Sequence, residues 1–207
     1  MRFFSSERYL ESTRDKARKR NKKNGLVPTV HYFHEPEDPY SQLAVQTLND
    51  LKSRYTLPFE VQLTPPREPT YRGSHKHVDQ WALQDVLTIA ADYGLAFAAE
   101  ATAPALEDVL LVRRKTAAAL KSDNFAQAAT EIGAAFWAGT LSDSDSNSGS
   151  AGDNATSAAL PPEFQNGDAK RAKLGHYQGA MFYFEGEWFW GVDRIRLLEK
   201  RLQAEGY

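Results

Sequence analysis

The chain has 207 residues and no cysteine, and its 25 Lys and Arg against 27 Asp and Glu leave a net charge of −2. This length fits one domain, or one domain with an insertion, and the lack of thiols excludes disulfides, thiolate metal sites and cysteine nucleophiles. The apolar runs are too short for a membrane span and the first residues lack the apolar stretch of a signal peptide, so we expect a cytoplasmic protein.

The first 25 residues are strongly basic. They carry nine Lys and Arg against three acidic residues, a charge of +6, whereas the rest of the chain sums to −8. Residues 5–23 have high helix propensity, and Gly25 is placed to end that helix. Such a segment either contacts nucleic acid or a membrane or lies as a solvated helix on its own acidic domain. We favour the second interpretation, because salt screens these charges, and so we expect no membrane and no nucleic-acid partner.

Two strands and a helix are predicted next. The β-formers of residues 26–33 predict a strand, and the alternation of apolar residues over 58–63 predicts another. Between them, Pro39 suits the first turn of a helix and Asp38 is its candidate N-cap. The three elements form a β-α-β unit, for which we expect parallel strands and a right-handed crossover.

The middle of the chain predicts a helical subdomain and then a loop. Three Ala- and Leu-rich segments fill residues 78–138 and are separated near Pro104 and Ser122. Residues 140–165 are rich in Ser and Asp and poor in large apolar side chains. Such a segment cannot offset the entropy lost on ordering, so we predict a flexible loop.

The last segment predicts a hairpin followed by a helix. The runs "AMFYF" and "EWFW" flank Glu185 and Gly186, which is a tight-turn signal, and Asp193 precedes a helix with an apolar face. The whole order is β-α-β, helices, then β-β-α. We therefore predict an α/β, thioredoxin-like fold with an inserted helical subdomain, divided into a basic N-terminal helix or arm (1–26) and a thioredoxin-like domain (27–207).

Two stretches resemble the DsbA-like thioredoxin-fold family, and within it the branch of 2-hydroxychromene-2-carboxylate isomerases and kappa-class glutathione transferases. "VHYFHEPEDPYSQLA" (30–44) is similar to the family's first strand and active-site turn, whose signature is Ser-Pro-Tyr-Ser or Cys-Pro-Tyr-Cys. "GHYQGAMFYFEGEWFWGVDRIRLLEKRL" (175–202) is similar to its closing hairpin and helix. The resemblance covers about residues 28–65, 78–138 and 172–205.

The resemblance implies a reaction and a site. In this family the turn holds a thiolate at a helix N-terminus, where the helix dipole and free N–H groups stabilise it; in the isomerase branch that thiolate belongs to glutathione. The resemblance thus implies a glutathione-dependent isomerase or transferase with a small-molecule substrate, no metal and a homodimeric state. It places Asp38 and Ser41 at the catalytic positions. The ligand-binding positions it implies are Pro39, Tyr40, Gly179, Ala180, Met181, Asp193 and Arg194.

The chain departs from the family's pattern at two positions. Asp38 stands where Ser or Cys is expected, and its carboxylate would repel a thiolate. Three roles remain for it: a protonated carboxyl that donates a hydrogen bond, a general base, or a helix cap. Where the family has a cis-proline, this chain has Gly179 and Ala180, whose peptide bond we expect to be trans. The binding edge there should then be reshaped or closed by Met181. Asp193 matches the residue that holds the γ-glutamyl amino group of glutathione, and an N-cap is its alternative role.

Other candidate residues carry less information. Two pairs of neighbouring histidines are present, His31 with His34 and His75 with His77, but neither has the further ligands that fix a metal site. Three functions stay open. The chain is a glutathione-dependent isomerase or transferase, a catalytically degenerate thioredoxin-fold module that binds a ligand or a protein, or an adaptor that uses basic residues 8–23. None of them is thiol-disulfide exchange by cysteines of the chain.

Overall fold

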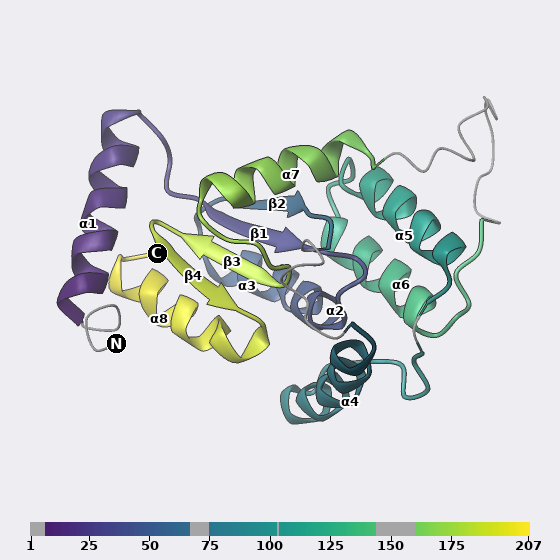
Figure 1. Ribbon diagram of the computed structural model, residues 1–207. Coiled ribbons are helices and arrows are strands. Elements are labelled where there is room, and N and C mark those ends of the chain that lie inside the picture. The colour runs from purple at the N-terminus through teal and green to yellow at the C-terminus, as the bar shows by residue number, and fades with distance from the viewer. Residues whose placement is uncertain (1–6, 67–74, 103, 144–159) are drawn as a thin grey trace.

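The computed structural model describes residues 7–66, 75–102, 104–143 and 160–207 (Figure 1). Its strands are β1 (Val30–His34), β2 (Phe59–Leu63), β3 (Met181–Phe184) and β4 (Glu187–Trp190). They form one sheet in the order β2-β1-β3-β4, in which β1 and β2 are parallel and the other neighbours are antiparallel. This is the β-α-β and β-β-α arrangement of a thioredoxin-like sheet, so the predicted α/β fold class is confirmed.

Three helices cover one face of the sheet: α2 (Pro39–Gln46), α3 (Leu48–Arg54) and α8 (Ile195–Ala204) (Figure 1). The sequence suggests one continuous helix after Pro39, but Thr47 divides it, and the Thr47 hydroxyl donates a hydrogen bond to the Ala44 carbonyl at 2.7 Å. The main core lies between this layer and the sheet, and its buried side chains include Val30, Tyr32, Leu43, Leu51, Phe182, Phe184, Leu198 and Leu202.

The opposite face carries α7 (Pro162–Lys173), whose first residues fall within the segment predicted as a loop up to residue 165. Paired prolines at its start and basic residues in its last turn are ordinary helix signals. Gly167 in the middle of α7 weakens the helix prediction from the sequence, since glycine is a poor helix former. The structure shows why glycine stands there: a Cβ at this position would lie 1.9 Å from the Leu63 carbonyl oxygen of β2.

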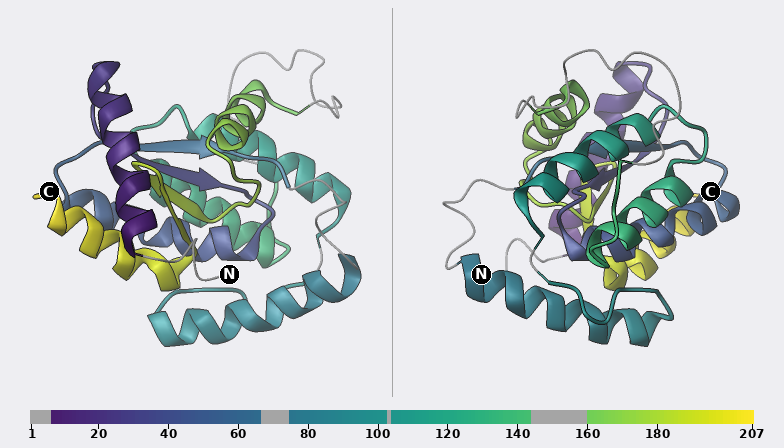
Figure 2. Two further views of the ribbon diagram at one scale, coloured as in Figure 1. Left: turned by 60° about the vertical axis from the view of Figure 1, so that its left-hand side comes forward. Right: turned by 90° about the vertical axis from the view of Figure 1, so that its right-hand side faces the viewer.

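The inserted helices are α4 (His75–Tyr93), α5 (Leu106–Ala119) and α6 (Phe125–Trp137). Both α4 and α6 contact α2, and α4 lies along the outside of the molecule (Figure 2). The helical region begins at His75, earlier than predicted, so His75 and His77 belong to a helix and not to a loop. Most of the predicted loop, residues 144–159, lies outside the described residues, and the predicted domain division stays a prediction.

The basic N-terminal segment forms α1 (Glu7–Lys23), which stands at the end of the sheet where β3 turns into β4 (Figure 1). Arg14 of α1 pairs with Glu187 of β4 at 2.9 Å, so the helix lies on its own domain, as predicted. In the part of the chain that the structure describes, no helix has both the length and the apolar character needed to cross a membrane.

The close approach of α7 to β2 predicts that replacing a helical glycine by alanine lowers the stability of the protein, which is the reverse of the usual effect. A Gly→Ala change inside a helix ordinarily favours the helix by about 1 kcal/mol, but in Gly167→Ala the added methyl meets backbone, and such overpacking costs about 1–3 kcal/mol. We expect a net loss of stability in urea unfolding. Asn166→Ala, at the exposed neighbouring position, should change stability by less than about 0.5 kcal/mol. A stabilised Gly167→Ala would contradict this packing.

Candidate functional site

The turn between β1 and α2 is closed by a helix cap. The carboxylate of Asp38 accepts hydrogen bonds from the backbone N–H of Tyr40 at 3.3 Å and of Ser41 at 3.1 Å, and Pro39 occupies the first helical position. These are amides that the helix N-terminus leaves without intrahelical partners. The predicted N-cap is confirmed, and it means that the positive end of α2 is already occupied by a carboxylate of the protein itself.

Ser41 lies beneath this cap and is fully buried. Its hydroxyl donates to Asp38 Oδ2 at 3.0 Å and accepts from the backbone N–H of Glu35 at 3.2 Å and of Ala180 at 2.8 Å. One oxygen therefore joins the turn, the helix and the start of β3. Because its hydrogen is engaged inside the protein, a catalytic role for Ser41 stays a prediction that would require this cluster to open.

The segment of Gly179 and Ala180 lies in direct contact with the turn. The described residues contain no cis peptide bond, so the bond between Gly179 and Ala180 is trans, as predicted. A Cβ on Gly179 would lie 2.5 Å from Glu35 Cβ. Ala180 has a φ of 51°, a strained conformation for alanine, which is held by its bond to Ser41 and by the bond from Gly191 N–H to its carbonyl at 2.8 Å.

Of the two alternatives predicted for this edge, closure by Met181 is wrong. Side chains alternate along a strand, so Ala180 and Phe182 point towards the main core while Met181 points to the other face. There it packs with Phe33 and Tyr183. The approach of Gly179 and Ala180 to the turn, and not Met181, is what narrows this edge of the site.

A cavity of about 920 Å³ opens beside the turn. Its walls come from the start of α2, from α4, α5 and the end of α6, and from the hairpin segment. Of the predicted site residues, Asp38, Pro39, Tyr40 and Gly179 line it. Its volume lies in the range of small-molecule sites, which is roughly 300–1,000 Å³, and its apolar walls include the rings of Trp137 and Trp190.

Two charged or polar pairs give the cavity its fixed polar groups. Arg113 of α5 forms a two-contact ion pair with Glu37, with Nη2 3.0 Å from Oε2. The Tyr40 hydroxyl donates to Asp85 of α4 at 2.8 Å. Burial, with a further contribution from the Asp85 hydrogen bond and the nearby carboxylates, raises the pKa of Tyr40, so this hydroxyl stays protonated at neutral pH.

Arg113 and Asp85 are site residues that were not predicted. Both lie within the inserted helices, among residues with ordinary helical spacing. No motif marks them, because their role depends on how α4 packs against α2 and how α5 packs against α6. Glu37 and Tyr40, by contrast, adjoin the turn motif and are visible in the sequence.

Asp193 and Arg194 do not line this cavity. They belong to a short 3₁₀ turn, Val192–Arg194, where both side chains are more than half exposed and their charged groups lie 3.5 Å apart. The side chain of Asp193 makes no capping hydrogen bond, and α8 begins two residues later, at Ile195. The predicted N-cap role of Asp193 is therefore wrong, and ligand contact by Asp193 and Arg194 stays a prediction.

His34 is linked to the turn through Tyr32. It is buried, and its Nδ1 lies 3.0 Å from the hydroxyl of Tyr32, which donates to the Ser41 carbonyl at 3.0 Å. Since the tyrosine hydrogen is used there, Nδ1 of the neutral imidazole is the donor. Burial lowers the pKa of His34 to about 3. Among the residues whose placement is described, no three His, Asp or Glu side chains gather as metal ligands would.

Comparisons with known proteins identify the fold and no family. No protein-family model matches the sequence, and no curated protein matches it. Among solved structures, a 2-hydroxychromene-2-carboxylate isomerase has a TM-score of 0.56 at 14% sequence identity, covering 85% of this chain and 95% of the isomerase. At that identity the likeness shows the fold alone, and it confirms the resemblance in fold to this DsbA-like group.

Two further solved structures are similar at 14% identity. One is assigned as a protein disulfide isomerase from Nitrosomonas europaea, with a TM-score of 0.49 and coverage of 87% of this chain and 100% of that one. The other is assigned as a DsbA oxidoreductase from Streptomyces coelicolor, with a TM-score of 0.48 and coverage of 86% and 90%.

The Ser41 cluster leads to a stability prediction. Ser41→Ala removes the acceptor of two buried backbone amides, and groups left unpaired in this way cost about 2–4 kcal/mol together. Urea unfolding should show this loss. Ser53→Ala is the matched control, because the Ser53 hydroxyl is exposed and bonds only within its own helix; its effect should stay below about 0.5 kcal/mol. Equal effects of the two substitutions would show that the cluster does not hold the turn.

Proposed function

We propose that this protein is a thioredoxin-fold module that binds a small molecule in the cavity beside α2, without thiol chemistry. The proposal rests on one observation: an open cavity lies beside a turn whose hydrogen-bond donors are already bonded within the protein. The cavity reaches the turn at Asp38 and Gly179. The groups that would act on a thiolate there are bonded to one another through Ser41.

Glutathione does not fit the donors present at this turn. A thiolate at the N-terminus of α2 would need the amides of Tyr40 and Ser41, and Asp38 already accepts from both. It would also lie beside the Asp38 carboxylate, which disfavours a second negative charge. The Ala180 amide, which faces the turn, donates to Ser41. Glutathione is therefore not part of the function that we propose.

The cavity has instead the features of a preformed binding site. Such sites combine apolar and aromatic walls with a few fixed polar groups, and here the Arg113–Glu37 and Tyr40–Asp85 pairs hold those groups in place before any ligand arrives. Tyr40 and Trp190 adjoin each other, with ring centroids 6.4 Å apart. Leu83 of α4 also lies in the cavity wall, so the lining suits a flat, partly apolar molecule.

A second candidate function is a glutathione-dependent isomerase or transferase. The observation in its favour is the likeness of the fold to a 2-hydroxychromene-2-carboxylate isomerase over 85% of the chain. That function would require the turn to rearrange so that the Ser41 hydroxyl and the Ala180 amide become available. A homodimeric state and a cytoplasmic location accompany this candidate and are likewise proposals.

Filling the cavity tests the first candidate. Fragment binders should be sought by ligand-observed NMR with the full chain, and then retested against Ala82→Phe, in which a bulky ring enters the cavity wall. We expect binding of cavity ligands to fall at least about tenfold, which corresponds to about 1.4 kcal/mol. Ala91→Phe, the same change at an exposed site of α4, should leave affinity unchanged. No binders, or binders indifferent to Ala82→Phe, would reject the proposal.

Calorimetric titration with reduced glutathione separates the two candidates. Because the donors of the turn are engaged, we expect no heat of binding up to the millimolar range. Saturable binding that Asp193→Ala weakens, and that Lys173→Ala on the remote helix α7 does not, would favour the isomerase or transferase instead.

A further inference from the structure

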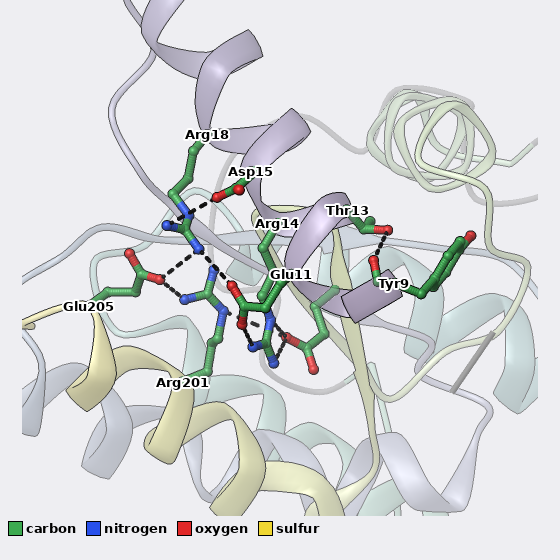
Figure 3. A network of polar contacts seen from close by, with 9 residues as sticks. Tyr9, Glu11, Thr13, Arg14, Asp15, Arg18, Arg201 and Glu205 are labelled. Carbon is green, nitrogen blue, oxygen red and sulfur yellow. Dashed lines mark hydrogen bonds and ion pairs between the residues drawn. The ribbon is translucent and has the colours of Figure 1, made fainter. Parts of the chain in front are cut away.

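The N-terminal helix α1 is fixed to the domain by one of its faces. Arg14 binds Glu187 at 2.9 Å, Arg18 reaches Glu205 at 3.3 Å, and Asn21 donates to Glu185 at 3.1 Å. Figure 3 shows these arginines gathered with Arg201, whose guanidinium is buried and also pairs with Glu205. Residues 14, 18 and 21 recur at helical spacing and define the inward face.

The acidic residues of α1 that the structure describes serve the same inward network. Glu11 lies 2.6 Å from Arg14 and 3.7 Å from Arg18, and Asp15 lies 3.5 Å from Arg18. Their charges are thus balanced by arginines that already hold the helix in place. Glu11 and Asp15 are themselves half exposed and line one surface hollow with Arg8, Lys16 and Lys19, so on the solvent side of the helix these two acids stand against a larger number of cations.

The opposite face of α1 is a row of exposed cations that form no ion pair with any residue the structure describes. We call this row the outer basic face; it consists of Arg8, Lys16, Lys19, Arg20, Lys22 and Lys23. It spans about 22 Å at 1.5 Å per residue. Since the inward contacts fix the helix, these charges are presented together on a rigid support and do not belong to a loose arm.

Two exposed aliphatic side chains follow α1 in the sequence, after Asn24 and Gly25. Leu26 is 57% exposed and Val27 is 66% exposed. They precede β1 and take no part in the clusters of the core. A group of cations next to exposed aliphatic residues is the combination that binds the interfacial region of an anionic bilayer.

We propose that the outer basic face of α1 docks the protein onto an anionic lipid surface. Phosphate and carboxylate headgroups would pair with the six cations, and Leu26 and Val27 would enter the headgroup boundary. A nucleic-acid backbone offers similar charges but gives the two aliphatic side chains nothing to contact, and this decides between the two partners. The sequence alone does not favour a membrane, because it cannot show which of its cations are already paired within the domain.

Docking of this kind does not conflict with the acidic body of the protein. The net charge of −2 is an average over a basic helix and the remaining chain, and α1 stands at one end of the molecule (Figure 1). Over a Debye length of about 8 Å at physiological salt, a headgroup next to the outer face senses the helix far more than the distant acidic residues. Binding should therefore weaken as the salt concentration rises.

Vesicle sedimentation with the full chain tests the proposal. The probes are vesicles of phosphatidylcholine mixed with phosphatidylserine, and vesicles of phosphatidylcholine alone. The wild-type protein should bind the first and not the second, and salt should reverse the binding. The triple change Lys16→Glu, Lys19→Glu and Lys23→Glu should lower partitioning by roughly a hundredfold, since each juxtamembrane cation contributes about a factor of five.

Two further variants distinguish a lipid surface from a nucleic acid and from a general effect of net charge. Lys52→Glu, Lys173→Glu and Lys200→Glu make the same change in net charge on other helices, at exposed positions, and should leave partitioning within about threefold of the wild type. Leu26→Ser with Val27→Ser should weaken vesicle binding and leave any binding of duplex DNA unchanged. Absent vesicle binding, equal loss in both triple variants, or DNA binding stronger than vesicle binding would each overturn the proposal.

Discussion

One buried hydroxyl holds the two halves of this thioredoxin-like fold together at its functional end. Ser41 Oγ accepts hydrogen bonds from the backbone N–H of Glu35, in the turn after β1, and of Ala180, just before β3. The same hydroxyl donates a hydrogen bond to the cap residue Asp38. Ala180 is far from the other two groups in the sequence. The left-handed backbone of Ala180, the contact of Gly179 with Glu35 and the geometry of the α2 N-terminus all depend on this oxygen.

The same cluster changes what the site can do. In a thioredoxin-like fold, free amides and the helix dipole can stabilise an anion at the N-terminus of the helix that corresponds to α2. Here the protein supplies that anion itself, as the carboxylate of Asp38, so the electrostatic demand of the helix is met internally. The neighbouring cavity is left with other fixed groups, a tyrosine bonded to Asp85 and an arginine bonded to Glu37. These suit recognition of a molecule better than activation of a sulfur atom.

The sequence predicts the strands, their succession along the chain and the turn because local signals and the core pattern agree there. The alternation of β2, the tight turn at Glu185 and Gly186, and the cap at Asp38 are all short-range features. The break at Thr47 and the helix around Gly167 depend on packing against other elements, which no local pattern records. For the same reason Arg113 reaches Glu37 only once α5 has packed against α6. The direction of Met181 is a different kind of error, since alternation from Ala180 already assigns it to the far face.

The atom at the centre of the turn is the Ser41 oxygen and not a thiol sulfur, and this affects how the turn responds to redox conditions. A thiol at that place would give the site two covalent states and tie it to the redox potential of its compartment. A serine hydroxyl has no such second state. The cluster of Ser41, Asp38 and Ala180 therefore keeps one form in oxidising and in reducing conditions alike. The ligand binding that we propose for the adjacent cavity would not depend on the redox potential.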